Sequence, residues 1–209
     1  MVKYNNDTIF LNYFFIKEEL IMFQKIDLNA AYNKGNPIYS VNQIGGKLET
    51  VPMDAEWISN IKNMPWYHEN NDITPYVNRD SKNGHRMFEL REKLLSFGGQ
   101  EVCLPIYEDD LADILDRGQF WFGDRITMKR GLPSQCHLNS CRCWNANKDK
   151  AVLCTGYALS KDGMWRQHSW CIHVKPRINR VVETTVERIA YFGFVMTEEE
   201  AKKFYDDTY

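Results

Sequence analysis

Residues 151–195, AVLCTGYALSKDGMWRQHSWCIHVKPRINRVVETTVERIAYFGFV, decide the fold. The stretch contains four apolar runs that are rich in β-branched and aromatic residues, and short polar segments separate them. Such runs are typical of β-strands. They predict strands at 151–159, 166–175, 179–184 and 189–195. We expect these strands, about four in number, to pair as an antiparallel meander.

A helix is expected on each side of these strands. Pro133 and Ser134 suit the start of a helix, and they precede residues 136–146, which we expect to be helical. Thr197 and Glu200 have the spacing of a capping box, which predicts a final helix. A helix, an antiparallel sheet and a second helix together make an α+β fold.

The pattern is also helical from residue 86 to the glycine pair at 98–99. Its apolar residues recur at steps of three and four, which places them on one helix face: Met87, Leu90, Leu94 and Leu95. Beyond this helix we expect a strand at 101–106, a second helix at 108–116, and strand and turn structure at 119–131.

The N-terminal part of the chain is harder to interpret. Residues 54–85 are rich in Asn, Asp, Pro, Trp and His, which indicates a long irregular segment with a short helix at 55–60. Long loops of this kind often act as lids or binding loops, although poor packing is the simpler explanation. We therefore expect two parts: an N-terminal extension with an irregular substrate-binding or lid region at 1–85, and a catalytic core at 86–209.

The charge balance argues against two classes of partner. The chain has 26 basic and 28 acidic residues, so it lacks the basic surplus that nucleic acid or an anionic membrane would select. No apolar run reaches the roughly 18 residues that a membrane span needs. The sequence also shows no secretory signal, and we expect a cytoplasmic protein.

The six cysteines are read as reduced thiols, because the chain is large and shows no export signal: Cys103, Cys136, Cys141, Cys143, Cys154 and Cys171. Structural zinc usually requires two paired knuckles. Cys141 and Cys143 are separated by one residue, and no second knuckle is present. A zinc-stabilised protein stays open as an alternative, but we expect no metal and no cofactor.

Cys136 is the candidate nucleophile. A helix N-terminus beside a histidine lowers the pKa of a thiol and makes it reactive. Cys136 lies where the helix at 136–146 should begin, and polar residues flank it, among them Gln135 and Asn139. A buried structural cysteine would be favoured if the residue lay in the middle of an apolar strand.

His168 and Glu183 are the candidate partners of this thiol. His168 begins a predicted strand and shares a face with Trp170, so alone it could be an ordinary core histidine. Glu183 ends the next predicted strand, where alone it could be a surface acid. Adjacent in a sheet, the carboxylate could orient the imidazole and stabilise its cation.

The order of these groups resembles the transglutaminase-like group of the papain-like superfamily. That pattern is Cys, a Gly-containing strand, His-Ala-Trp and a hydrophobic-Asp-Pro-Thr motif. This chain has Cys136, then 155–158 (TGYA), 168–170 (HSW) and 182–185 (VETT), with Glu in place of Asp and Thr in place of Pro. The resemblance covers residues 130–196 and implies a papain-like core, with the Cys helix packed on the antiparallel sheet.

The resemblance also implies acyl transfer at an amide of a peptide or protein. Cys136 would attack the carbonyl carbon, His168 would protonate the leaving group, and water or an amine would release the thioester. Gln135 or Asn139 could help to bind the oxyanion, and Trp170 could form a wall of the site. The alternative is a non-catalytic binding module or inhibitor on the same scaffold.

Overall fold

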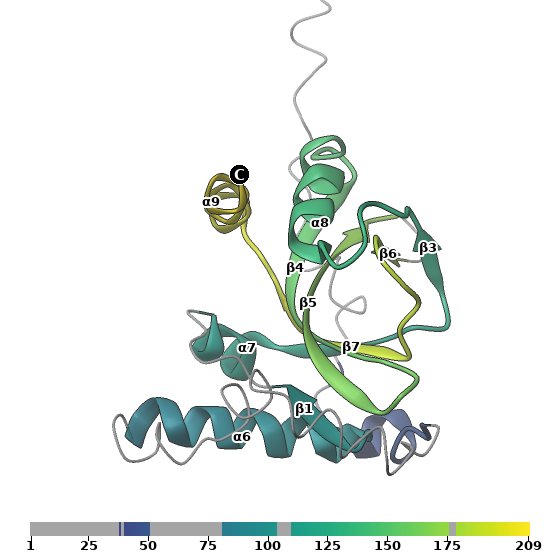
Figure 1. The fold of residues 1–209 in the computed structure, drawn as a ribbon, viewed down its shortest axis with the longest axis vertical. Helices are drawn as coiled ribbons and strands as arrows, with labels where there is room; N and C mark the ends of the chain where they lie inside the picture. Colours follow the sequence, from purple (N-terminus) through teal and green to yellow (C-terminus); the bar gives the residue numbers. More distant parts are fainter. Residues whose placement is uncertain (1–37, 39, 51–80, 104–109, 176–178) are drawn as a thin grey trace, which may run out of the picture.

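The computed structural model describes residues 38, 40–50, 81–103, 110–175 and 179–209, and these form an α+β structure (Figure 1). In chain order its elements are η2 (Val41–Ile44), α6 (Ser81–Phe97), β1 (Glu101–Cys103), α7 (Leu111–Arg117), β2 (Gln119–Phe122), β3 (Ile126–Met128), α8 (Cys136–Asn145), β4 (Ala151–Leu159), β5 (Met164–His173), β6 (Arg180–Glu183), β7 (Ala190–Val195) and α9 (Glu198–Thr208). The predicted lid region and the short helix at 55–60 lie outside the described residues.

The sheet is larger than the predicted meander and is ordered differently. Its strands run β2-β7-β4-β5-β6-β3, and β1 pairs in parallel with the start of β5. Strands β4, β5 and β6 form the expected antiparallel meander, but β7 pairs with β4 and not with β6. The outer edge of β6 is occupied by β3, which runs parallel to it. The expected position of the last strand was therefore wrong.

Two apolar clusters lie on opposite faces of this sheet, and β4 contributes to both because its side chains alternate. All nine residues of β4 are buried. The first cluster joins Leu153 and Tyr157 to the apolar faces of the four described α-helices. The second cluster consists entirely of strand residues, including Trp121 and Trp170, so the curled sheet encloses it.

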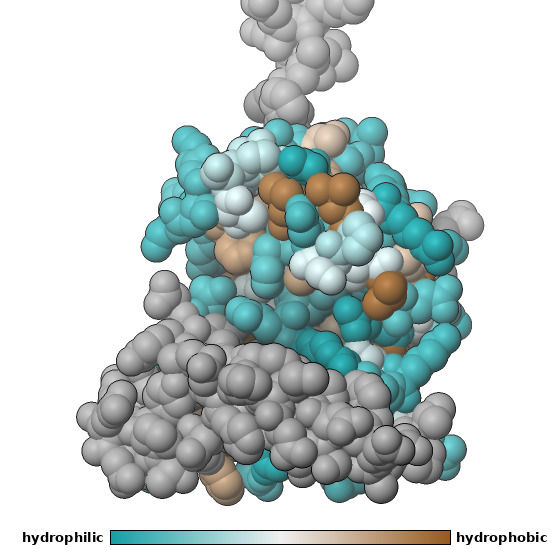
Figure 2. Space-filling model, in the orientation of Figure 1, coloured by the Kyte–Doolittle hydropathy of each residue, from teal (hydrophilic) through white to brown (hydrophobic). Residues whose placement is uncertain are grey.

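Helix α8 packs along β4 and β5, and α9 lies beside α8 (Figure 1). The predicted capping box is confirmed: the Thr197 hydroxyl accepts from the Glu200 amide, and the Glu200 carboxylate accepts from the Thr197 amide. Much of the coloured surface in Figure 2 is hydrophilic, with hydrophobic residues gathered in small groups. Among the described helices, none combines the length and apolar character of a membrane span.

Gly156 allows β4, β5 and β7 to approach one another beside the site. It pairs with His168 on one side and with Gly193 on the other. Its φ is +154°, and a Cβ added there would lie 2.2 Å from the carbonyl oxygen of Phe192. No L side chain fits at that distance without a shift of the backbone.

We therefore expect Gly156→Ala to lower the free energy of unfolding by at least about 2 kcal/mol, measured by urea denaturation. Gly45→Ala is the matched control, because Gly45 also has a positive φ but nothing lies within 4 Å of its added Cβ. Equal losses for the two variants would show that backbone strain, and not the contact with Phe192, is what matters.

Candidate active site

Cys136 is the first residue of α8, and a tightly held loop presents it. Ser134 has a φ of +57°, a conformation that few non-glycine residues adopt. The side chain of Asn139 holds the loop from within the helix. Its Oδ1 accepts from the Leu132 amide at 3.0 Å, and its Nδ2 donates to the Leu132 carbonyl at 2.8 Å. Cys136 is left half-buried at the N-terminus of the helix.

Hydrogen bonds hold α8 on β5. The Ser140 hydroxyl donates to the carbonyl oxygen of Ser169 at 2.8 Å. The Cys171 thiol donates to the carbonyl oxygen of Ser140 at 3.3 Å. Both bonds involve Ser140, about one helical turn from the start of α8, and one of them reaches Ser169, the strand residue that follows His168. The position of Cys136 relative to His168 is therefore set by buried polar contacts.

His168 and Glu183 form a buried pair. Their exposed side-chain fractions are 2% and 0%, and Nε2 of His168 lies 2.9 Å from Oε2 of Glu183. This contact leaves Nδ1 as the ring atom available to the thiol of Cys136. Burial disfavours the imidazolium, but hydrogen bonds with Cys136 and Glu183 outweigh it and raise the pKa of His168. Such contacts favour a protonated ring.

Glu183 accepts hydrogen bonds at both carboxylate oxygens. Oε2 accepts from the Tyr191 hydroxyl at 2.9 Å as well as contacting His168. Oε1 accepts from the Thr184 amide at 2.8 Å, and from the amide and hydroxyl of Thr185 at 2.7 and 2.9 Å. Burial alone would raise the pKa of Glu183, yet His168 and Thr185 lower it to about 2. The buried acid is therefore ionised at neutral pH.

The sequence did not identify Tyr191 as part of the site. It lies on β7, and its side chain belongs to the cluster enclosed by the sheet, together with Trp170. Its contact with Glu183 depends on the pairing of β7 with β4, which the strand pattern does not reveal. Burial and the neighbouring Glu183 carboxylate raise the pKa of Tyr191 well above its ordinary value, so Tyr191 remains a hydrogen-bond donor.

Cys136 has the electrostatic environment of a reactive thiol. Burial would raise its pKa, but hydrogen bonds with His137 and His168 lower the pKa to about 5. The unpaired amides at the start of α8 favour the thiolate as well. At neutral pH the thiol is therefore ionised beside a raised-pKa histidine, an arrangement that suits nucleophilic attack.

His137 is a second partner of the Cys136 thiol. Residues next to each other on a helix usually point in different directions, so this contact depends on how the His137 ring is held. Its Nδ1 lies 2.7 Å from the Ser169 hydroxyl, and its ring packs against Phe204 with the ring centres 5.7 Å apart. Together these contacts fix the ring next to the thiol. His137 touches no carboxylate among the described residues, which distinguishes it from His168.

The remaining predicted site residues lie in different environments. Gln135 is the exposed N-cap of α8. Both polar atoms of the Asn139 side chain already bond to Leu132, so the structure gives Asn139 a role in holding the loop. An oxyanion role for either residue stays a prediction. Trp170 is fully buried and stacks on His168 at 15°, so its ring orients the histidine from inside the core.

The other cysteines provide no comparable site. All six cysteines are free thiols. The hydrogen bond with Cys171 lowers the pKa of Cys143 to about 7, whereas burial raises the pKa of Cys154. Within the described residues, no three His, Cys, Asp or Glu side chains are grouped as metal ligands. Cys136 is the cysteine whose thiol contacts histidines in the part of the chain that is described.

Tyr191→Phe tests the carboxylate network. The change removes one donor to Glu183, so we expect the free energy of unfolding at pH 7 to fall by about 1–3 kcal/mol. The pKa of Glu183 should also rise. Because this pKa is depressed in the folded protein, the stability it contributes is present above the ordinary carboxyl pKa and is lost as the pH falls towards about 2. Acid unfolding should therefore begin at a higher pH.

Urea unfolding at several pH values measures both effects of Tyr191→Phe. Tyr205→Phe is the matched control, because it removes a hydroxyl on α9 outside the contacts of Glu183. An unchanged onset of acid unfolding in Tyr191→Phe would show that Tyr191 does not stabilise the ionised carboxylate.

Comparison of the chain with protein-family models, with curated proteins and with solved structures finds no match in any of the three.

Proposed function

We propose that the chain is a cysteine-dependent acyl hydrolase or acyltransferase that acts on an amide bond. The observation that supports this best is the alignment of three groups from three elements. A half-buried thiol at the start of α8 contacts His168 on β5, whose other ring nitrogen lies 2.9 Å from the buried Glu183 on β6. A thiolate, an imidazolium and an orienting carboxylate are what covalent acyl transfer requires.

In the proposed reaction the Cys136 thiolate attacks the carbonyl carbon of the amide, and the carbonyl oxygen takes the negative charge. The carbon–nitrogen bond then breaks, and the imidazolium of His168 gives its proton to the leaving amine. This leaves a thioester on Cys136 and a neutral His168. Water or a second amine attacks the thioester and loses a proton to His168, and the thiolate departs. Both groups return to their starting ionisation states.

Glu183 has a positioning and electrostatic role in this scheme. It contacts Nε2 of His168, which directs Nδ1 at the thiol, and its charge stabilises the imidazolium. Its other contacts, with Thr184, Thr185 and Tyr191, keep the carboxylate fixed while the charge on His168 changes. Electrostatic groups that are already oriented need no rearrangement during the reaction, which is the source of their effect.

A non-catalytic binding module on the same scaffold is the competing proposal. A module that works only by surface contact has no need for an ionised thiol held beside a histidine. Nor does it need a buried carboxylate, which is costly to keep charged. The contacts of Glu183 and the lowered pKa of Cys136 favour the enzyme.

Acylation by p-nitrophenyl acetate tests the proposal, with intact-protein and peptide mass spectrometry after acid quenching. We expect a burst of nitrophenol release and an acetyl group on Cys136 that hydroxylamine removes. Cys136→Ala should abolish both, whereas Cys143→Ala should retain them. Acetyl groups spread over several cysteines at similar rates would contradict the proposal. A peptide library analysed for cleavage and amine exchange then distinguishes hydrolysis from transfer.

A further inference from the structure

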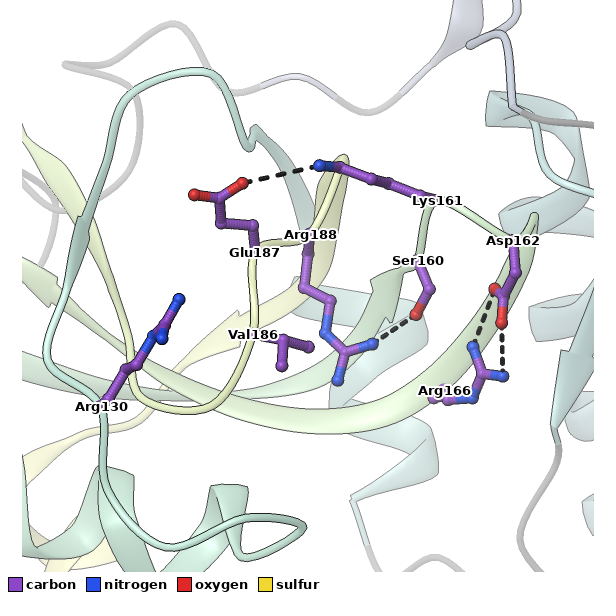
Figure 3. A pocket seen from close by; sticks show the side chains of 8 residues that line it. All are labelled: Arg130, Ser160, Lys161, Asp162, Arg166, Val186, Glu187 and Arg188. Atoms are coloured by element: carbon purple, nitrogen blue, oxygen red, sulfur yellow. Dashed lines mark hydrogen bonds and ion pairs between the residues drawn. The ribbon is translucent and has the colours of Figure 1, made fainter.

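A cationic cavity is lined by residues 186–188, which follow β6 in the chain, and by side chains from other segments (Figure 3). Its volume is about 580 Å³. The side chains around it are four cations, two carboxylates, a serine and a valine: Arg130, Lys161, Arg166, Arg188, Asp162, Glu187, Ser160 and Val186. The cations outnumber the acids although the whole chain has a formal net charge of −2. The positive charge is therefore a local feature of this cavity.

Both carboxylates of the cavity already have partners. Asp162 binds the guanidinium of Arg166 through two hydrogen bonds of 3.0 and 2.8 Å. Glu187 lies 3.6 Å from Lys161 in an exposed ion pair. Arg166 and Lys161 are thereby neutralised, and the positive charge that remains belongs to Arg130 and Arg188.

Among the described residues, Arg130 and Arg188 form no ion pair with a carboxylate, although the charge of Arg188 helps to lower the pKa of Asp162. Arg130 is exposed and points into the cavity (Figure 3). Arg188 donates to the Ser160 hydroxyl through one terminal nitrogen, and its Nε is buried without a hydrogen-bond partner. Arg188 lines the cavity, so an anion bound there would balance the charge of its guanidinium.

The cavity connects to the candidate active site through two backbone segments. The Lys129 and Gly131 amides donate to the carbonyls of Glu183 and Thr184 at 2.8 Å, which fixes Arg130 beside the end of β6. The loop that leaves Arg130 reaches Cys136 six residues later, so the two lie at most about 20 Å apart along the chain. A peptide of several residues spans that distance.

We propose that Arg130 and Arg188 form a subsite that binds a carboxylate of the peptide substrate, an inference that rests on the proposed acyl-transfer function. The guanidinium fork matches a planar carboxylate in two-point geometry, as Arg166 already does with Asp162 in the same cavity. The carboxylate belongs to an acidic side chain or to the C-terminus of the substrate.

The first test measures binding without catalysis. The full chain, labelled with ¹⁵N-arginine, is titrated while the Nε–H signals of Arg130 and Arg188 are followed by NMR. N-acetylglutamate α-amide presents a side-chain carboxylate, N-acetylglycine presents a terminal one, and N-acetylglutamine α-amide is the neutral control. We expect saturable shifts with one or both carboxylates and none with the neutral compound. Arg130→Gln should weaken binding roughly tenfold. Arg125→Gln, an equal charge change outside the cavity, should not.

The second test links the subsite to Cys136. Peptidyl acyloxymethyl ketones that differ only by Glu or Gln are compared for their rate of labelling Cys136, with iodoacetamide as a small neutral reference. We expect the Glu reagents to label roughly tenfold faster, and we expect Arg130→Gln or Arg188→Lys to remove most of that preference. The iodoacetamide rate should be unchanged in both variants.

Several outcomes would overturn the inference. Equal NMR shifts with the glutamate and glutamine compounds would overturn it. Shifts with inorganic phosphate, but with neither carboxylate compound, would show that the subsite does not bind a carboxylate. Fast iodoacetamide labelling, with neither a Glu preference nor a shift on either carboxylate compound, would remove the subsite and leave the proposed function standing. Slow iodoacetamide labelling of Cys136 with retained carboxylate binding would instead reject the proposed function. The bound carboxylate could then no longer be assigned to a substrate.

Discussion

Replacing Glu183 by Gln is expected to lower amide turnover roughly a thousandfold, because a neutral amide can neither stabilise the imidazolium nor hold the correct tautomer of His168. The effect on acylation by p-nitrophenyl acetate should be smaller, since nitrophenolate leaves without receiving a proton. Amide turnover needs both the Cys136 thiolate and a proton from His168, whereas acylation by p-nitrophenyl acetate needs the thiolate alone. The comparison of the two substrates therefore distinguishes a loss of proton donation from a loss of the thiolate.

The same variant should also be less stable. Every described contact of Glu183 supplies a hydrogen-bond donor, so the NH₂ group of a glutamine would face another N–H or O–H. We expect the free energy of unfolding at pH 7 to fall by about 2–4 kcal/mol. The depressed pKa of Glu183 stabilises the fold above the ordinary carboxyl pKa, and that stabilisation is lost towards pH 2. The loss in the variant should therefore shrink as the pH falls.

Glu92→Gln is the matched control, because the Glu92 side chain on α6 is 57% exposed and forms only a surface ion pair with Arg91. We expect turnover and stability close to those of the parent protein. A Glu183→Gln variant that is folded and retains full amide turnover would contradict the role assigned to the carboxylate.

His168→Ala is expected to shift the pH dependence of Cys136 alkylation. The midpoint should rise from about 5 towards the value of an ordinary thiol, because the variant loses a cation beside the sulfur. Near pH 6 the thiolate fraction should fall several hundredfold, but a thiolate of higher pKa is more nucleophilic, so the net rate should fall roughly tenfold. Above pH 9 the variant should react faster than the parent protein, and the two profiles should cross.

His137→Ala is the comparison that decides which histidine forms the pair. Both rings contact the thiol, but His168 alone lies against the buried carboxylate among the described contacts. We expect His137→Ala to raise the alkylation midpoint by less than His168→Ala and to retain amide turnover. Peptide mapping after timed iodoacetamide labelling measures the midpoints. A larger shift in His137→Ala, with loss of turnover, would transfer the proton-donor role to His137.

The strands of the C-terminal half could be predicted because their apolar runs are long. The strand at 151–159 is confirmed with both ends correct, and the strand expected at 166–175 is observed as Met164–His173. Strands β1 and β3 contain only three residues each, which is too short for alternation to show. The predicted strand at 101–106 is described only as Glu101–Cys103, since residues 104–109 lie outside the described part.

Strand pairing could not be predicted in the same way. The pattern of a strand predicts which of its side chains share a face, but it does not predict which edge of the sheet a later strand will join. Strand β7 joins β4, and this pairing is what brings Tyr191 to Glu183. The helix expected from residue 86 to the glycine pair at 98–99 is observed as Ser81–Phe97, because the polar residues at its start show no apolar periodicity.

The candidate site was predicted in part. Cys136, His168 and Glu183 are brought together, as their positions at a helix start and on neighbouring strands suggested. The cavity around Arg130 and Arg188 could not be foreseen, because its residues come from three separate loops and from β5. Charge patterning along the chain does not show which cations will lack a partner.

A ¹⁵N NMR titration of the His168 ring, in the parent protein and in Cys136→Ala, tests the thiolate–imidazolium pair most directly. We expect both ring nitrogens to be protonated at pH 7 in the parent protein. We also expect the pKa of His168 to fall when the neighbouring thiolate is removed. A neutral His168 at pH 7, or the same His168 pKa with and without Cys136, would show that no thiolate–imidazolium pair exists and would contradict the proposed function.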